Sequence, residues 1–406
     1  MTERRPPRRS ASRPFPPMGA MTSGPLTRRR FLERAGLALG AVAFGPALLA
    51  ACGSDDDSSS GGSGGSGGGG GSNDIAISNW TSYMDKPQLK VFAQATGISV
   101  DYREDINDNN EYFAKIRPNL SKDQSIDTDG FVLTDWMASR IINTLEWAQP
   151  LDEAKFPNKA NMSPALANPA FDPGRRYSAP WASGATGIAY NISTTGKEIR
   201  SIDDYLSAPG TKTALSEMRD TMGLFMLSAG ADPTTPSYAA AGPAFDKLQK
   251  AVDDGEITQF TGNEYVGDLG NGDIAAAIAW SGDVAQITVD NPDVRFVIPD
   301  EGGMLWSDNF MIPYTSEKPA EATEFINFFY DPANAAELMA FIQYISPVVG
   351  VADQLRTIGG KAAELADNPL VVPTEEFLAG LTIFGSLDDE EEVKFDTRFA
   401  EISGSG

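Results

Sequence analysis

The sequence predicts an α/β protein built from two similar units. Between residues 75 and 133, short apolar or alternating segments are interleaved with amphipathic ones in a strand, helix, strand, helix, strand order. A second alternation of the same kind runs from residue 236 to residue 298. The length of 406 residues also exceeds that of one typical domain. Because strands that alternate with helices pair in parallel, we expect parallel pairing within each unit.

The N-terminus has the features of an export signal. Arginines at 28 to 30 are followed by Phe31 and Leu32, and an apolar run over residues 35–51 ends at Cys52. The arginines resemble a twin-arginine signal, and Leu-Ala-Ala-Cys resembles the lipobox of bacterial lipoproteins. The run is too short for a permanent membrane span, so we expect residues 1–52 to be a signal peptide with Cys52 as the lipidated new N-terminus. Three methionines are candidate start residues: Met1, Met18 and Met21.

Residues 53–72 contain only Gly, Ser and Asp. Such a segment cannot bury apolar surface and is expected to behave as a flexible coil. At a root-mean-square reach of roughly 25 Å, it would form a tether between the membrane and a folded body.

The first unit is expected to begin at residue 75. Asp85 and Pro87 are typical of a helix start, and Gly97 is typical of its end. A later helix is indicated by four apolar residues on one face between Asn109 and Leu120. The strands of this unit are predicted at Ile75–Ser78, Ser99–Tyr102 and Gly130–Leu133.

The second unit follows a segment that is rich in Gly, Pro and Ser, Tyr177–Asn191, which we interpret as the crossing between units. Paired helices near the C-terminus are predicted at Pro319–Tyr330 and Ala333–Ile345. The second unit itself is predicted to contain helices at Pro236–Asp254, Glu264–Leu269 and Asp283–Asp290, and strands at Ile274–Trp280 and Arg295–Ile298.

The composition excludes several classes of function. The chain has no histidine and one cysteine, which excludes imidazole catalysis, His/Cys metal sites and intramolecular disulfides. Beyond residue 52 there are 23 basic and 54 acidic residues, a net charge of −31, which disfavours nucleic acid as a partner. We expect no cofactor and no metal, although an enzyme that uses only carboxylates stays an alternative.

Aromatic residues follow the ends of three predicted strands, at 79–83, 134–136 and 280–283. Ligands of open α/β sheets bind beyond the carboxyl ends of strands. Aromatic faces attract ammonium groups, and Asp308, two residues after Trp306, could supply a compensating carboxylate. Because aromatic faces also stack on flat or aliphatic ligands, this pattern predicts a ligand site and leaves the class of ligand open.

Over residues 75–345 the sequence resembles the polyamine (spermidine/putrescine) binding proteins of ABC importers. Each of the motifs is short, and their combination is specific. They are Asn79-Trp80-Thr81-x-Tyr83, Phe171-Asp172-Pro173, Tyr177-Ser178-x-Pro180, Gly184-Ala185-Thr186-x-Ile188, Trp280-Ser281-Gly282, Glu301-Gly302-Gly303-x-x-Trp306-x-Asp308, Pro313 and Phe325-Ile326-Asn327-Phe328.

The resemblance implies a periplasmic-binding-protein type II, or Venus-flytrap, fold. Each lobe would be a mixed sheet flanked by helices, with a hinge of crossing strands. Lobe 1 would comprise residues 73–183 and 307–352, and lobe 2 residues 184–306 and 353–406. The protein would then be an extracytoplasmic, lipid-anchored monomer that delivers its solute to an ABC permease and ATPase and catalyses no reaction.

Carried over position by position, the resemblance assigns nine residues to the ligand site: Trp80, Thr81, Tyr83, Thr134, Trp136, Trp280, Trp306, Asp308 and Tyr344. Thr134 stands in place of a serine and Trp136 in place of a tyrosine.

One departure concerns an acidic pair of that family, whose positions are taken here by Met218 and Thr221. Glu217 or Asp220 could substitute for that pair if the local backbone differs, but we interpret these neighbouring acids as the start of a surface helix. The ligand could therefore be a shorter or singly charged amine, or another small organic solute.

Two acidic segments receive simpler interpretations. Residues 105–110 lack the glycine and the final carboxylate of a calcium loop. The five acids at 388–392 are expected to form a solvated face at the start of a terminal helix.

Overall fold

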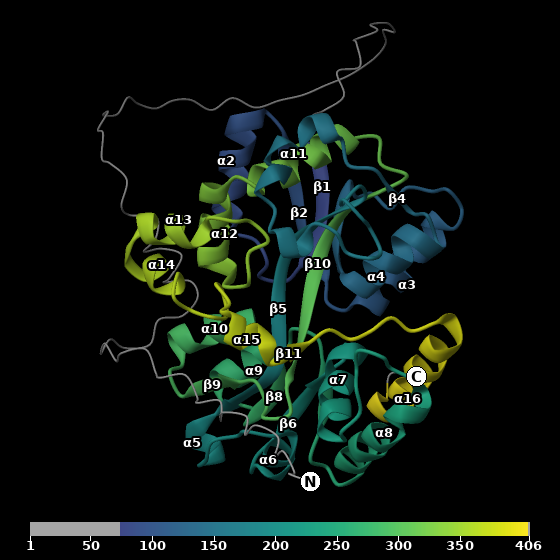
Figure 1. Ribbon diagram of the computed structural model, residues 1–406, viewed down its shortest axis with the longest axis vertical. Helices are drawn as coiled ribbons and strands as arrows, with labels where there is room; N and C mark the ends of the chain where they lie inside the picture. The colour runs from purple at the N-terminus through teal and green to yellow at the C-terminus, as the bar shows by residue number, and fades with distance from the viewer. Residues whose placement is uncertain (1–73, 405–406) are drawn as a thin grey trace, which may run out of the picture. The chain divides into compact units, whose positions relative to one another are not determined.

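Two long antiparallel strands, β5 (Ser178–Asn191) and β10 (Gly303–Pro313), run through both halves of the protein (Figure 1). The computed structural model describes residues 74–404. Every residue of β5 is buried. The predicted crossing at 177–191 is therefore a continuous strand whose backbone hydrogen bonds to β10 join the halves.

The first half is a mixed sheet covered by helices. Its strand order is β2-β1-β3-β10, with β1 parallel to its two neighbours and β3 antiparallel to β10. Its elements are β1 (Asp74–Trp80), α2 (Lys86–Thr96), β2 (Ser99–Ile106), α3 (Asn109–Leu120), β3 (Gly130–Thr134), α4 (Asp135–Ser139), β4 (Ala148–Gln149), α11 (Pro319–Phe329), α12 (Pro332–Ile342), α13 (Val351–Ile358) and α14 (Gly360–Leu365).

The second half continues the same sheet in the order β5-β8-β6-β7, with β9 also paired to β5. β8 is antiparallel to β5 and parallel to β6. Its elements are α5 (Ile192–Thr195), α6 (Ile202–Ser207), β6 (Lys212–Leu215), α7 (Met218–Ser228), α8 (Tyr238–Asp253), β7 (Gln259–Thr261), α9 (Tyr265–Asn271), β8 (Ala276–Trp280), α10 (Ser281–Asp290) and β9 (Val294–Val297). The predicted α/β class with a mixed sheet is confirmed.

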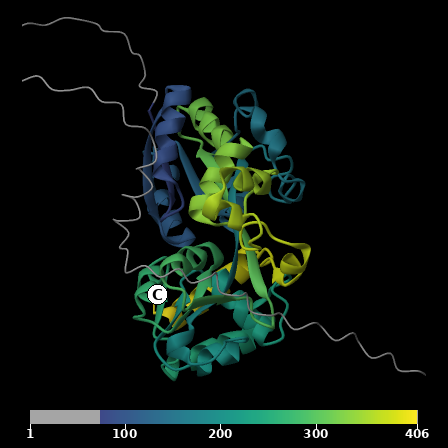
Figure 2. The ribbon, with the colours of Figure 1, turned by 90° about the vertical axis from the view of Figure 1, so that its left-hand side faces the viewer.

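The C-terminal segment returns to the second half later than expected. We expected residues 353–406 in lobe 2, but α13 packs against α12 and α14 packs against α13, so residues 353–365 lie with the first half. The chain then forms α15 (Glu375–Ala379), β11 (Leu381–Thr382), which pairs with β10, and α16 (Asp389–Ser403), which packs on α8 and α7. Figure 2 shows part of this yellow segment at the level where the halves meet.

Local signals account for the ends of several helices. α3 begins where predicted because the Asp108 side chain accepts hydrogen bonds from the backbone N–H groups of Asn110 and Glu111. The helix predicted to run through Ile345 is wrong at its end: α12 stops at Ile342, and Gln343 adopts a left-handed conformation at φ 58°. Tyr344 therefore leaves the helix, which frees its ring to reach the pocket described below.

β6 was not predicted, and α7 was predicted only as a helix start at Glu217 and Asp220. β6 has four residues, too few for a clear alternation, and α7 begins without a side-chain cap. These two elements bring Glu217 and Asp220 to the junction of the halves.

A buried polar network holds the start of β5 against β10. Arg175, 1% exposed, donates to the Asn309 and Ser178 side chains at 2.6 and 3.1 Å. Asp172 Oδ2 accepts from the Tyr177 and Ser178 N–H groups and from the Ser178 hydroxyl, at 2.8–3.0 Å. Because buried donors that lose an acceptor are costly, this network fixes the strand crossing.

We expect Asp172→Asn to lower the free energy of unfolding by about 2 to 4 kcal/mol, since an amide group cannot accept all of these bonds. Denaturant titration followed by circular dichroism measures the change. Asp388→Asn is the control, because Asp388 is an exposed helix cap and Asn caps about as well. Equal stability of the two variants would contradict the role given to Asp172.

Candidate functional site

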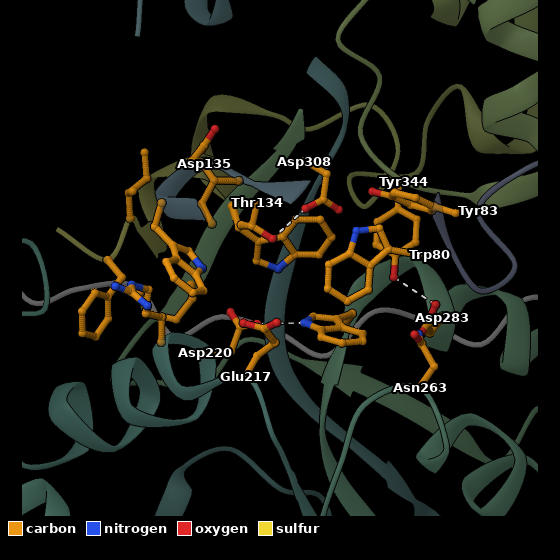
Figure 3. Close-up of a pocket in the computed structure, with 18 of the residues that line it drawn as sticks. Trp80, Tyr83, Thr134, Asp135, Glu217, Asp220, Asn263, Asp283, Asp308 and Tyr344 are labelled. Carbon is orange, nitrogen blue, oxygen red and sulfur yellow. Dashed lines mark hydrogen bonds between the residues drawn. The ribbon is translucent and has the colours of Figure 1, made fainter. Parts of the chain in front are cut away.

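A pocket lies where the two halves meet, beyond the ends of β1, β3, β6 and β8 and alongside β10 (Figure 3). All nine residues that the sequence assigned to a ligand site line it. Thr81 is exposed at its rim, whereas the others are buried or partly buried. The structure thus brings the nine residues together, and their role in binding stays a prediction.

Aromatic rings from both halves form the pocket walls. Trp80 meets Trp280 edge to face with ring centroids 5.9 Å apart, and Trp280 meets Trp306 at 6.4 Å. Tyr344 lies 5.6 Å from Trp306 and 5.1 Å from Tyr83. Edge-to-face pairs of this kind favour fixed ring orientations.

The three indole N–H groups are bonded within the protein. Trp80 donates to the Val132 carbonyl at 3.0 Å, Trp280 to Asp220 at 2.9 Å, and Trp306 to the Thr186 hydroxyl at 3.0 Å. These bonds fix the orientations of the three rings. A ligand can therefore contact the ring faces and edges, but the indole N–H groups are already used.

Two glycines allow the rings to approach this closely. A Cβ atom at Gly184 would lie 2.5 Å from the Trp306 ring, and one at Gly282 would lie 2.4 Å from the Tyr344 ring. Any side chain at either position would displace a wall of the pocket, which explains the glycines in the Gly-Ala-Thr and Trp-Ser-Gly motifs.

Asp308 is a buried carboxylate on β10. It lies opposite Thr134 in the β3–β10 register and accepts a hydrogen bond from the Thr134 hydroxyl at 2.8 Å. A bulge between Asp308 and Asn309 interrupts the pairing with β5, a device that re-aims side chains at sites. Burial raises the pKa of Asp308 from 3.8 to about 7, against the lowering effect of the Thr134 bond.

Asp283, on the first turn of α10, was not among the predicted site residues. Its carboxylate accepts from the hydroxyls of Tyr344 at 3.0 Å and Tyr265 at 2.9 Å, and from the Asn263 amide at 3.1 Å. The bond from Tyr344 joins the two halves. The signal was present, because Asp283 ends the Trp-Ser-Gly-Asp segment that follows a strand.

The interpretation of Glu217 and Asp220 as a helix start is confirmed, since α7 begins at Met218, but the placement of these acids at the surface is wrong. Both line the pocket, and Glu217 is 6% exposed. Being three residues apart, they share one face of α7, whereas Met218 and Thr221 are buried away from solvent, with the Thr221 hydroxyl bonded to the Leu215 carbonyl. The acidic pair is thus present one residue before the positions inferred from the resemblance.

Burial controls the protonation of this pair. It raises the pKa of Asp220 to about 6, although bonds from Trp280 and Thr186 oppose the rise. It raises the pKa of Glu217 well above its usual value, and the nearby Asp108 adds to the effect. Glu217 also accepts from the Asn109 backbone and side chain, at 2.6 and 2.8 Å, across the junction.

Further polar contacts close the pocket between residues 107–109 of the first half and two loops of the second. The Asn107 side chain accepts a hydrogen bond from the Asn263 N–H group and donates one to the Glu264 carboxylate, both at 3.1 Å. The Ser216 hydroxyl donates to Asp108 at 3.0 Å. The acidic segment at 105–110 therefore contributes contacts between the halves.

Between residues 74 and 404 no group of three or more Asp, Glu or Cys side chains is arranged to hold a metal ion. In the same range no helix is both long and apolar enough to cross a membrane. Cys52, the signal peptide and the tether lie outside the described residues.

Comparisons with known proteins agree with this architecture. Residues 88–373 match the family model of bacterial extracellular solute-binding proteins. The chain is 28% identical over 329 residues to the putrescine-binding periplasmic protein PotF of Escherichia coli K12, covering 75% of this chain and 84% of that protein. It is 27% identical over 342 residues to the putrescine-binding periplasmic protein SpuD of Pseudomonas aeruginosa, covering 77% and 86%.

Solved structures extend the match to the fold. A protein from Listeria monocytogenes assigned to a spermidine/putrescine ABC transporter superposes with a TM-score of 0.73 at 26% identity, over 82% of this chain and 100% of that chain. The periplasmic-binding-protein type II fold predicted from the sequence is confirmed.

The raised pKa of Asp308 predicts a pH dependence of stability. Because the folded-state pKa of about 7 exceeds the usual 3.8, this group contributes stability below about pH 4 that is lost as the pH rises through 7. The loss is at most about 1.4 kcal/mol per pH unit for one proton. In ligand-free protein, Asp308→Asn should therefore lose less stability than wild type between pH 5 and 7.5.

Denaturant titrations at a series of pH values give the two stability curves. Curves that stay parallel across this range would show that Asp308 is not a high-pKa group.

Proposed function

The chain belongs to the family of bacterial extracellular solute-binding proteins, and from this premise we propose that its pocket binds a polyamine-like cation for delivery to an ABC importer. The observation that carries the proposal is the placement of the Asp308, Asp283 and Asp220 carboxylates around a box of fixed aromatic rings. An ammonium group would supply positive charge beside these carboxylates, and the rings would cover an alkyl chain.

The energetics favour a cation over a neutral solute. A buried carboxylate is costly unless it is paired, and the raised pKa values of Asp308 and Asp220 express that cost. A ligand ammonium would lower both values by stabilising the charged forms. Cation–π contacts with the tryptophans would add about 0.5 to 2 kcal/mol each when desolvated.

Relatives support the choice of ligand class. The two curated relatives described above are named for putrescine binding, and the Listeria structure is assigned to spermidine/putrescine transport. Glu217 and Asp220 line the pocket, so two acids are present at the start of α7. The sequence-based reason to expect a singly charged ligand therefore no longer holds.

The remaining parts of the proposal concern delivery. Hydrogen bonds between the halves, such as Tyr344 to Asp283, would hold the closed form that a permease and its ATPase receive. We propose binding without catalysis, because hydroxyl, amide and indole groups already donate hydrogen bonds to the pocket carboxylates and hold them in place. The protein would act as a monomer outside the cytoplasm, anchored through a lipid on Cys52.

Asp308→Asn tests the ligand class, because the change is nearly isosteric and removes the charge. We expect putrescine affinity to fall at least about a hundredfold, since hydrogen bonds to charged groups contribute about 1.5 to 3 kcal/mol and stranding an ammonium costs more. Isothermal titration calorimetry and tryptophan fluorescence both measure it. Asp101→Asn, at an exposed position on β2, is the control for net charge. A loss under threefold would favour a neutral solute.

Cys52→Ala tests the anchor. If the Leu-Ala-Ala-Cys segment is processed and lipidated, the variant should leave the membrane fraction and appear in the soluble extracytoplasmic fraction. Immunoblotting of both fractions after a high-salt wash gives the distribution. Retention of the variant in the membrane at the wild-type level would rule out Cys52 as the anchor.

A further inference from the structure

One cationic side chain, that of Arg219, lies in the described wall of the pocket among the acids. It occupies the first turn of α7, between Glu217 and Asp220. A cation at a helix N-terminus is opposed by the helix dipole, so this position is not one that helix stability favours. A role in the pocket gives a reason for it.

Two aromatic side chains hold the Arg219 guanidinium. Its central carbon lies 3.6 Å from the ring centroid of Trp136, in the first half, and 6.0 Å from that of Phe384. Glu392 on α16 is its ion-pair partner, with Nη2 and a carboxylate oxygen 3.5 Å apart. Phe384 and Glu392 lie beyond residue 373, where the family match ends, so the C-terminal segment completes this end of the pocket. Glu392 is thus more than part of the solvated face expected at 388–392.

Several acids act on the charge of Arg219, namely Glu392, Asp396 and Glu217, but among the described residues only Glu392 forms an ion pair with it. The residue is 7% exposed, and its Nε and Nη1 atoms have no hydrogen-bond partner among the described residues. Glu392 also pairs with Arg140 at 3.4 Å, so its charge is shared. Because a guanidinium stays protonated in proteins and acts over a lower dielectric when buried, Arg219 repels other cations nearby.

Charge is therefore distributed unevenly along the pocket. At the end near α7, Arg219 offsets Asp220, and burial favours the neutral form of Glu217 by raising its pKa. Figure 3 shows Asp283 on the far side of the pocket from Glu217 and Asp220, whereas Asp308 lies near enough to Asp220 for that carboxylate to add to the rise in its pKa. An ammonium group meets attraction near Asp308 and Asp283, and repulsion near Arg219.

We propose that Arg219 is a specificity-determining residue, which excludes an ammonium group from the end of the pocket formed by Trp136 and Phe384, so that the site prefers a short diamine to a triamine. The inference rests on the proposed function. The two ammonium groups of a diamine are held within the aromatic box. A triamine must extend further and place a charge next to the guanidinium.

The test compares putrescine and spermidine binding by calorimetry in wild type, Arg219→Met, Arg140→Met and Arg117→Met. Wild type is expected to bind putrescine at least about tenfold more tightly than spermidine, about 1.4 kcal/mol. Arg219→Met should narrow this ratio to within about threefold by strengthening spermidine binding. Arg140→Met leaves Glu392 to pair with Arg219 alone, so the ratio should narrow in part. Arg117→Met, at an exposed position on α3 outside the pocket, is the control for the loss of one arginine, and its ratio should stay at the wild-type value.

The outcomes separate this inference from the proposed function. If wild type binds neither polyamine, the proposed function fails and the inference fails with it. If putrescine binds but the ratio is the same in wild type and Arg219→Met, the inference alone is overturned. Melting temperatures check that each variant folds, and Arg219→Gln, which keeps a polar head without the charge, gives the same comparison should Arg219→Met unfold.

Discussion

Burial of carboxylates inside an aromatic pocket is the constraint on which the rest of the structure depends. Asp308 and Asp220 lie where burial opposes their charge, and each accepts bonds from side chains that are themselves fixed. Donors such as Thr134 and Thr186 limit the cost without removing it, because hydroxyl groups carry no charge. Under the proposed function, the charge of a bound cation would complete the compensation.

The crossing strands supply the precision that such a site needs. In the β5–β10 pairing, Trp306 lies opposite Gly184, and in the β5–β8 pairing Thr186 lies opposite Trp280. One strand therefore sets the positions of two tryptophans and of the threonine that accepts from Trp306. The Arg175–Asn309 contact ties the segment just before β5 to β10.

Much of this could be predicted from the sequence, because the decisive signals are local. The cap at Asp108 and the apolar face of α3 locate that helix, and the aromatic residues after strands locate the pocket. Other features depend on distant contacts: Glu392 meets Arg219 and Arg140 through packing that no sequence spacing indicates. The misplacement of Glu217 and Asp220 has a different origin. A shift of one residue along a helix rotates the side chain by about 100°, so a residue expected on the buried face lies on the pocket face instead.

The closed arrangement links charge to conformation. Contacts between the halves at Asn107, Asp108 and Asn109 are few, and water can replace the bond from the Asn107 amide to exposed Glu264 at little cost. Closure also buries the carboxylates, which without a ligand is unfavourable. A cation that binds between the halves would make this burial of the carboxylates favourable. It would stabilise the charged acids only where residues of both halves surround it. The ligand's differential affinity for the closed state therefore has a physical source in the same buried acids that select its charge.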